Sequence, residues 1–155
     1  SIRRRQRQMC IRDSFNKVKE LEKTTHRQTV LKGNLGQTII DNSFNSNPIS
    51  NQSSLDLLGS FITKGKKYLI TPGMVELGDD QFTFNYEFAH NASSVIDEAL
   101  IVGYTNRVSL MLSFEENNIP VKFFKNRDLA VSYLNSVVEE DDVVLFENDL
   151  PDHHP

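Results

Sequence analysis

The residues best placed for chemistry form a polar segment behind a short apolar run. After Ile39 and Ile40, positions 41–48 read Asp-Asn-Ser-Phe-Asn-Ser-Asn-Pro. Its carboxylate and asparagine amides can bind hydroxyls, amines and phosphates. Pro48 suits the first position of a helix and Asn47 the cap before it, which leaves backbone N–H groups free at the positive end of a helix dipole. The segment therefore predicts a ligand-binding loop between a strand and a helix.

An ordinary capped turn explains the same residues equally well, because Asn, Ser and Pro are common in turns for local reasons. Other reactive side chains are sparse. Cys10 is the only cysteine, which excludes an internal disulfide and a multi-cysteine metal site. His153 and His154 lack well-spaced partners, so a frayed terminus explains them better than a metal, and we expect no metal site.

Length and composition indicate one domain. A chain of 155 residues with 38% hydrophobic content can bury one core but not two substantial ones. No apolar run approaches the ~18 residues that a membrane helix needs, and no signal-peptide core is present. We therefore expect a cytoplasmic protein without a membrane partner.

The charge is unevenly distributed. Residues 1–14 carry five arginines against one aspartate, whereas the rest of the chain holds 12 basic and 20 acidic side chains. A basic arm can bind nucleic acid, but no aromatic residues alternate with these arginines and the body is acidic, so we expect no nucleic-acid partner. Residues 5–14 also resemble a peptide that arises when sequencing-adapter DNA is translated. We therefore interpret residues 1–14 as an artefactual, disordered arm outside the fold.

Apolar periodicity predicts an alternation of strands and helices. Helices are expected at 15–21, 49–62, 81–92, 106–116 and after the cap Asn126, and strands at 25–32, 37–41, 68–70, 99–102, 121–124 and 143–146. Expected inward-facing residues are Leu55, Leu58 and Ile62; Phe84, Phe88 and Ala92; Val108, Met111 and Leu112; and Ala130, Tyr133, Leu134 and Val137. The alternation predicts a three-layer α/β fold with a mostly parallel sheet and helices on both faces.

In an open parallel sheet, ligands bind outside the carboxyl ends of the strands. The loops expected there are residues 41–47, 71–79, 103–106, 124–126 and 147–152. Any binding site should be built from these loops.

Two of these loops carry a resemblance to a known family. Positions 41–48 are similar to the Asp-Asp-Ser-Tyr-Asn-Ala-Asn-Pro signature of one branch of the Mur ligases, and positions 72–78, Pro-Gly-Met-Val-Glu-Leu-Gly, resemble its Gly-Asp-Met-x-Glu-Leu-Gly stretch. The order and spacing of the two also fit. His26 and Arg27 lie where the family has a basic residue between its central and C-terminal domains. The resemblance covers most of the chain and implies a Rossmann-like C-terminal domain.

The resemblance also implies a function. Mur ligases are three-domain, ATP-dependent enzymes that add an amino acid or a dipeptide to a UDP-N-acetylmuramoyl peptide in peptidoglycan precursor synthesis. ATP and Mg²⁺ are held mainly by the central domain, and no Gly-x-x-x-x-Gly-Lys-Ser/Thr loop occurs here. This implies a fragment that is inactive alone and whose partners are the missing N-terminal and central domains, the UDP-linked peptide and the amine substrate. Residues 15–25 would be a linker remnant, 26–152 the domain and 153–155 a tail.

The residues implied to bind substrate or nucleotide are carried over one by one, and no catalytic residue is assigned. They are Asp41, Asn42, Asn45, Asn47, Glu76 and Arg27. Asn42 replaces a second aspartate, Phe44 a tyrosine and Gly73 an acidic residue, and Glu147 begins a stretch where the family has Lys-Gly-Ser-Arg. Glu76 could orient the substrate amine or be a solvated helix-dipole partner, and Arg27 could contact the nucleotide or form a weak surface ion pair.

A second hypothesis remains open at this point. The chain could be a non-catalytic Rossmann-like module that binds a nucleotide or peptide through the Asp41 loop. An upstream reading frame that continues into a domain with a phosphate-binding lysine loop would favour the ligase, whereas a native start near residue 15 would favour the module.

Overall fold

The computed structural model describes residues 28–43 and 47–148. The predicted helix at 15–21 and the predicted arm, linker and tail therefore lie outside the described residues. The described elements are β1 (Thr29–Lys32), β2 (Thr38–Asn42), α2 (Pro48–Ser60), β3 (Lys67–Thr71), the short 3₁₀ helix η1 (Gly78–Asp80), α3 (Gln81–Ala92), β4 (Glu98–Val102), α4 (Arg107–Glu116), β5 (Val121–Phe124), α5 (Arg127–Val137) and β6 (Val143–Glu147).

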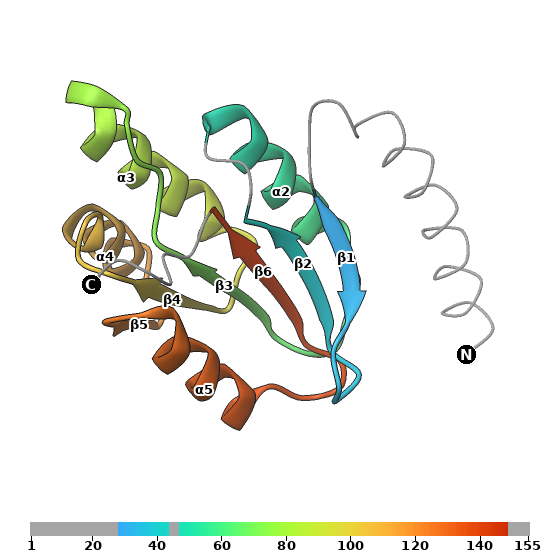
Figure 1. Ribbon diagram of the computed structural model, residues 1–155. Coiled ribbons are helices and arrows are strands. Elements are labelled where there is room, and N and C mark those ends of the chain that lie inside the picture. Colours follow the sequence, from blue (N-terminus) through green and yellow to red (C-terminus); the bar gives the residue numbers. More distant parts are fainter. Residues whose placement is uncertain (1–27, 44–46, 149–155) are drawn as a thin grey trace.

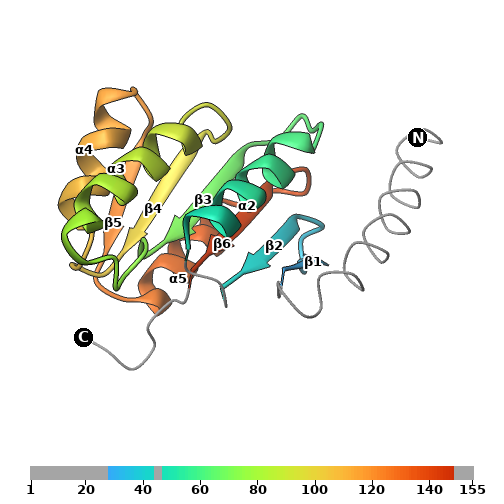
Figure 2. The same cartoon turned by 90° about the horizontal axis from the view of Figure 1, so that it is seen from above.

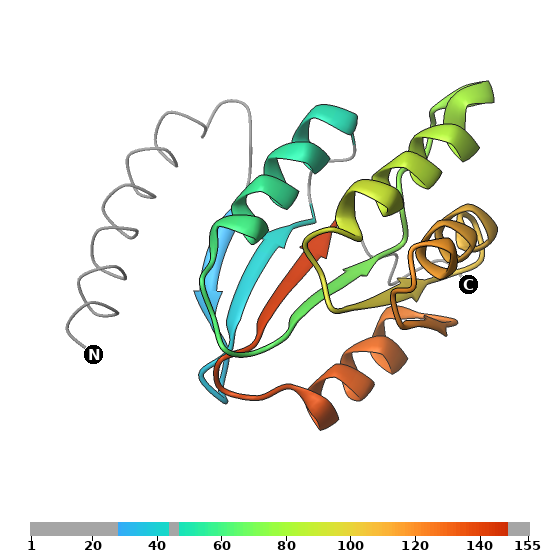
Figure 3. The ribbon, with the colours of Figure 1, turned by 180° about the vertical axis from the view of Figure 1, so that it is seen from behind.

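The strands form one six-stranded sheet in the order β1-β2-β6-β3-β4-β5. All neighbouring pairs are parallel except β1 with β2, which form an antiparallel hairpin around Gly33 and Gly36. The last described strand, β6, lies between β2 and β3 and pairs with both. Helices α2, α3 and α4 cover one face of the sheet, and α5 covers the other (Figures 1 and 3). The predicted fold class is confirmed.

Local sequence explains where two of the helices begin. The side chain of Asn47 accepts a hydrogen bond from the Ser50 N–H at 2.9 Å, and Pro48 follows as the first helical residue of α2. Asn126 caps α5 in the same way, accepting from the Leu129 N–H at 3.0 Å. Each cap satisfies one backbone donor that the first helical turn leaves free. Both predicted caps are confirmed.

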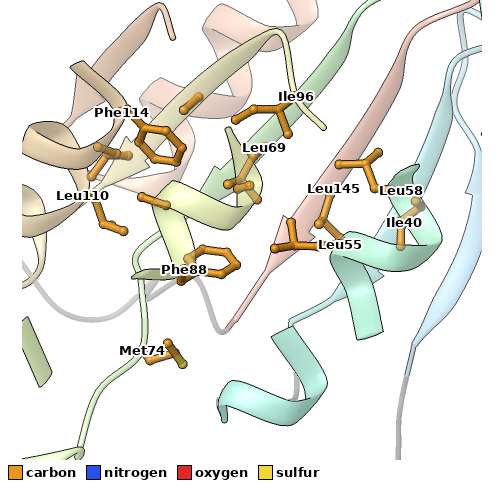
Figure 4. Close-up of a cluster of buried hydrophobic side chains, with 14 of the residues drawn as sticks. Ile40, Leu55, Leu58, Leu69, Met74, Phe88, Ile96, Leu110, Phe114 and Leu145 are labelled. Atoms are coloured by element: carbon orange, nitrogen blue, oxygen red, sulfur yellow. The ribbon is translucent and has the colours of Figure 1, made fainter. Parts of the chain in front are cut away.

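Two apolar clusters fill the space on either side of the sheet. The larger one packs α2, α3 and α4 against the sheet, and Figure 4 shows Leu55 and Leu58 of α2 beside Ile40 of β2 and Leu145 of β6. The smaller one joins α5 to the opposite face of β3, β4 and β6. In Figure 2 the sheet is seen from above, with β1 beyond β2 at one edge. Strands β3, β4 and β6 are therefore buried on both faces, as is typical of a parallel sheet.

The predicted inward face of α4 is wrong for Val108 and Leu112, whereas Met111 packs against the large apolar cluster as expected. Val108 and Leu112 are 70% and 42% exposed, whereas Leu110 and Phe114 are fully buried and Ser109 and Ser113 lie beside them. Both sets follow helical spacing, so periodicity could not choose between them. The face with Ser109 and Ser113 is the buried one. The two hydroxyls donate to backbone carbonyls, and the small side chains let α4 pack closely on α3.

Ile62 also differs from its prediction. The helix that contains Leu55 and Leu58 ends at Ser60, so Ile62 lies in the following loop and is 79% exposed.

Within the described residues, no helix combines the length and apolarity needed to cross a bilayer.

Candidate functional site at the carboxyl edge of the sheet

The parallel strands bring the predicted loops to one edge of the sheet. Asp41 and Ile70 lie in register with Phe146 on either side of β6, and Thr71 is in register with Ile101. Consequently the loops that follow β2, β3, β4 and β6 all leave the sheet at the same end. The two segments that resemble Mur ligase motifs therefore meet at one edge, as the sequence analysis expects.

Asp41 and Asn47 occupy the two ends of the first loop. One carboxylate oxygen of Asp41 accepts from the Ser43 N–H at 3.0 Å, which fixes a local turn and leaves the second oxygen available for a hydroxyl or amine. Asn47 uses its side-chain oxygen for the helix cap and is exposed. Asn45 lies outside the described residues, and so does Arg27.

Asn42 has a different environment from the one that a binding residue needs. It points to the α2 side of the sheet and is 1% exposed, and its amide nitrogen lies 2.8 Å from Glu147 Oε1 and 2.5 Å from Ser54 Oγ. The strand alternation explains this, since Ile40 and Asn42 face α2 while Asp41 faces the other way. In this arrangement Asn42 supports Glu147, and a direct contact with a ligand stays a prediction that requires the pair to separate.

Glu147 is the centre of a buried polar cluster, the Glu147 cluster, at this edge. Its members come from β2, the end of β6 with the residue that follows it, and the first turns of α2: Asn42, Asn51, Ser54, Glu147 and Asn148. All are at most 2% exposed. Among residues 28–43 and 47–148, no hydrogen-bond partner is found for the side-chain N and O atoms of Asn51 and Asn148 or for Oε2 of Glu147. Because most buried polar groups in proteins are paired, this cluster is only partly satisfied.

Burial changes the acidity of Glu147. Loss of hydration raises the pKa of its carboxyl to about 8, although hydrogen bonds from Asn42 and Ser54 favour the charged form. The carboxyl is therefore mostly protonated at neutral pH. A protonated carboxyl can donate a hydrogen bond as well as accept one.

Glu76 lies on the second loop and is exposed. Its backbone has a φ of 62°, the left-handed region that is unusual for a residue other than glycine. Neighbouring Gly73 and Gly78 also have positive φ. Beneath the loop, the buried side chains of Asn85 and Asn106 bond to its backbone. The Glu76 position thus belongs to a loop of fixed and uncommon shape.

Sequence reasoning missed the buried polar residues of both loops. A signal for Glu147 was present, because strict alternation along β6 places it on the same face as Val143 and Leu145. Asn85 carried no comparable signal, since an asparagine in a helix usually faces solvent. The described residues contain no group of three or more His, Cys, Asp or Glu side chains that could hold a metal.

Comparison with known proteins points to one family. No model of a protein family matches the chain. A curated protein, the UDP-N-acetylmuramoyl-tripeptide--D-alanyl-D-alanine ligase of Bacillus subtilis, is 33% identical over 75 residues. The matched segment is 48% of this chain but only 16% of that protein.

Solved structures share the fold. The chain matches MurF from Acinetobacter baumannii with a TM-score of 0.65 and 15% identity, covering 79% of this chain and 27% of that one. It matches MurF ligase from Thermotoga maritima in complex with ADP with a TM-score of 0.61 and 22% identity, covering 78% and 26%. A domain of a protein described as a UDP-N-acetylmuramate:L-alanyl-γ-D-glutamyl-diaminopimelate ligase from Haemophilus ducreyi gives a TM-score of 0.57 and 16% identity, covering 79% and 88%.

These matches support the resemblance: the fold is that of a Mur ligase C-terminal α/β domain. Among the Mur ligases, the sequence and the structures point to UDP-N-acetylmuramoyl-tripeptide--D-alanyl-D-alanine ligase, MurF, as a relative. The chain spans about a quarter of the length of the MurF structures that it matches.

Proposed function

We propose that this chain is the C-terminal domain of an ATP-dependent amide ligase that adds an amino acid or a dipeptide to a UDP-N-acetylmuramoyl peptide. The observation that carries the proposal is the meeting of the Asp41 loop and the Glu76 loop at the carboxyl edge of one parallel sheet. The sequence similarity to a ligase of this kind supports it.

The proposal divides the work between domains. A central domain, absent from this chain, holds ATP and Mg²⁺, and ATP converts the carboxylate of the UDP-linked peptide to an acyl phosphate. The C-terminal domain closes over the nucleotide and excludes water, which protects the acyl phosphate from hydrolysis. A cytoplasmic location is part of the same proposal.

Asp41 and Glu76 are the two described carboxylates that we assign to substrate binding. Asp41 offers one free oxygen beside the turn at Ser43, and Glu76 offers an exposed carboxylate across the same edge. Either group can accept a hydrogen bond from a hydroxyl or compensate the charge of an amine. Asn45, Asn47 and Arg27 remain proposed substrate or nucleotide contacts, and Asn42 is proposed to act through Glu147, to which it donates a hydrogen bond.

Kinetics of the complete ligase that contains this domain test the proposal. With ATP, UDP-N-acetylmuramoyl tripeptide and D-alanyl-D-alanine, Asp41→Ala should lower kcat/KM at least tenfold, or about 1.4 kcal/mol of transition-state binding. Asp56→Ala is the control, because Asp56 is exposed on α2 and, in the described part of the chain, accepts a hydrogen bond only from Gln52. Equal kinetics for the Asp41 variant and the unaltered enzyme would contradict the proposed role.

The division of labour has its own test. The chain alone should bind ATP only weakly, because the central domain supplies most phosphate contacts. Calorimetry of the 155-residue chain with ATP measures this directly. Micromolar affinity would show that the domain binds nucleotide by itself and would favour a separate binding module.

A further inference from the structure

The loop that carries Glu76 is packed against the core at Met74 and Leu77 and exposed to solvent between them. Met74 is 1% exposed and lies at one end of the large apolar cluster (Figure 4), and Leu77 packs against the same cluster. Between them, Val75 is 43% exposed and Glu76 is exposed with φ of 62°. Within the described part of the chain, no hydrogen bond or ion pair engages the Glu76 carboxylate. An exposed, unpaired carboxylate gives no energy that would hold this unfavourable backbone conformation, so other residues must hold it.

Asn85 of α3 provides the first part of that support. Its side-chain oxygen accepts from the Met74 N–H at 2.7 Å, and its amide nitrogen lies 3.0 Å from the Met74 carbonyl and 2.8 Å from the Gln81 carbonyl. Asn85 is fully buried. A side chain that bonds to both the N–H and the C=O of one residue fixes the peptide planes on either side of it, here next to the raised segment.

Asn106, at the start of α4, provides the second part. Its amide nitrogen donates to the carbonyls of Pro72 at 3.0 Å and Met74 at 2.9 Å, and its oxygen accepts from Gln81 Nε2 at 2.9 Å and Asn85 Nδ2 at 3.1 Å. The two asparagines therefore join α3, α4 and the loop. Every polar atom of both side chains has a partner, which is the condition under which a buried network rigidifies its surroundings.

Gly73 shows how closely this network fits. A Cβ atom at Gly73 would lie 2.7 Å from Asn85 Oδ1, 2.8 Å from Asn106 Nδ2 and 2.9 Å from Asn106 Cβ. The loop backbone thus lies directly on the two amides. Only glycine leaves room for this contact and also accepts the φ of 82° found there.

We infer that Asn85 and Asn106 are positioning residues that hold the Glu76 loop in one shape, so that the Glu76 carboxylate is presented to the substrate amine at a fixed place on the carboxyl edge. This inference rests on the proposed ligase function. It assigns the two asparagines to substrate orientation through Glu76, without contact to the substrate themselves. Preorganised groups of this kind lower the entropy lost when the reacting groups are brought together.

Hydrogen exchange of the 155-residue chain tests the structural half of the inference. Asn85→Ala and Asn106→Ala should each accelerate exchange of the Met74 amide, whose N–H donates to Asn85 Oδ1, by about tenfold or more, because the loop then opens without global unfolding. Asn91→Ala is the control, since Asn91 is an exposed asparagine on the same helix as Asn85. If Asn85→Ala does not fold, Asn106→Ser, a milder change at the edge of the network, carries the same test. Unchanged exchange of the Met74 amide in both variants would overturn the inference.

Kinetics of the complete ligase test the functional half. The same variants should raise the KM for D-alanyl-D-alanine by about tenfold or more and leave the KM for ATP within about twofold. A purely structural defect would lower the active fraction, and hence kcat, without changing one KM selectively. Glu76→Gln should reproduce the amine effect, and adding Asn106→Ala to it should give little further loss if both act through Glu76.

The outcomes separate the two claims. Ligation by the unaltered enzyme together with unchanged KM values in the variants would overturn the inference and leave the proposed function standing. Absence of ligation by the unaltered enzyme, with ATP, UDP-N-acetylmuramoyl tripeptide and D-alanyl-D-alanine present, would overturn the proposed function and the role in orientation with it.

Discussion

Two buried polar groups lie at the same edge of the sheet and differ in how completely they are bonded. The Asn85 and Asn106 side chains have a partner for every polar atom, whereas the Glu147 cluster leaves atoms of Asn51, Glu147 and Asn148 without one. A satisfied network contributes to stability and shape, and an unsatisfied one lowers stability by the cost of desolvation. The difference indicates that the Glu76 side of the edge is preformed, whereas the Glu147 side holds buried polar atoms that lower the stability of the fold.

The largest expected effect is that of Gly73→Ala. The added methyl group would collide with both asparagines and would also require a strained φ, so the free energy of unfolding should fall by about 4 kcal/mol. Gly78→Ala is the matched control, because Gly78 also has positive φ but its Cβ position is empty to 4 Å. It should cost only about 1 kcal/mol. Chemical denaturation measures both, and equal losses would mean that the close approach at Gly73 is unimportant.

A pair of identical substitutions compares the two polar groups directly. Asn85→Leu should destabilise the protein by about 3 kcal/mol, because it leaves the buried Met74 N–H and the Asn106 side-chain network without the Asn85 partner. Asn51→Leu should be neutral or stabilise by up to about 1 kcal/mol, because the amide that it removes has no partner. Both sites are buried in helices. Urea titrations measure the free energy of unfolding of both variants. Equal decreases for the two would show that the two polar groups do not differ in their contribution to stability.

The smallest expected effect concerns pH. The pKa of Glu147 is raised to about 8 in the folded state from an ordinary value of 4.5, so the folded state holds a proton that the unfolded state releases between these values. Stability from this group is therefore full below pH ~4.5 and falls as pH rises toward 8. As the pH rises from 5 to 8, the free energy of unfolding of Glu147→Gln should increase by about 2 kcal/mol relative to that of the unaltered protein. The change is smaller than the full pKa difference would give, because local opening lets water reach the carboxylate. A constant difference between the two proteins across this range would rule out the raised pKa.

The sequence predicted the order of elements well and their buried faces unevenly. The expected helix at 81–92 coincides with α3, and the expected strand at 121–124 with β5, because period and end signals agree there. On α4, by contrast, two stripes compete, and contacts between helices decide in favour of Ser109 and Ser113. Ile62 was assigned to a helix that ends two residues earlier.

In the candidate site, too, the positions of the loops were predictable from the sequence, whereas the burial of individual side chains was not. The position of Asp41 at the carboxyl edge followed from strand order, because parallel strands end together. The burial of Asn42 did not, since one residue of register decides which of two neighbours faces α2. The side chains of Asn85 and Asn106 bond to residues 11 to 34 positions away along the chain. The one local contact is that of Asn85 with Gln81, four positions before it. Local sequence patterns carry no information about the distant pairs.

The place of β6 in the sheet has a consequence for synthesis. As the last of the described strands, it supplies the hydrogen bonds that join the β1–β2 hairpin to β3, β4 and β5. Until residues 143–147 leave the ribosome, the nascent domain consists of two half-sheets with open edges facing each other, a state prone to wrong pairing. A chain that ends before Val143 would therefore lack the strand that links the two halves, although nearly all its other elements would be present.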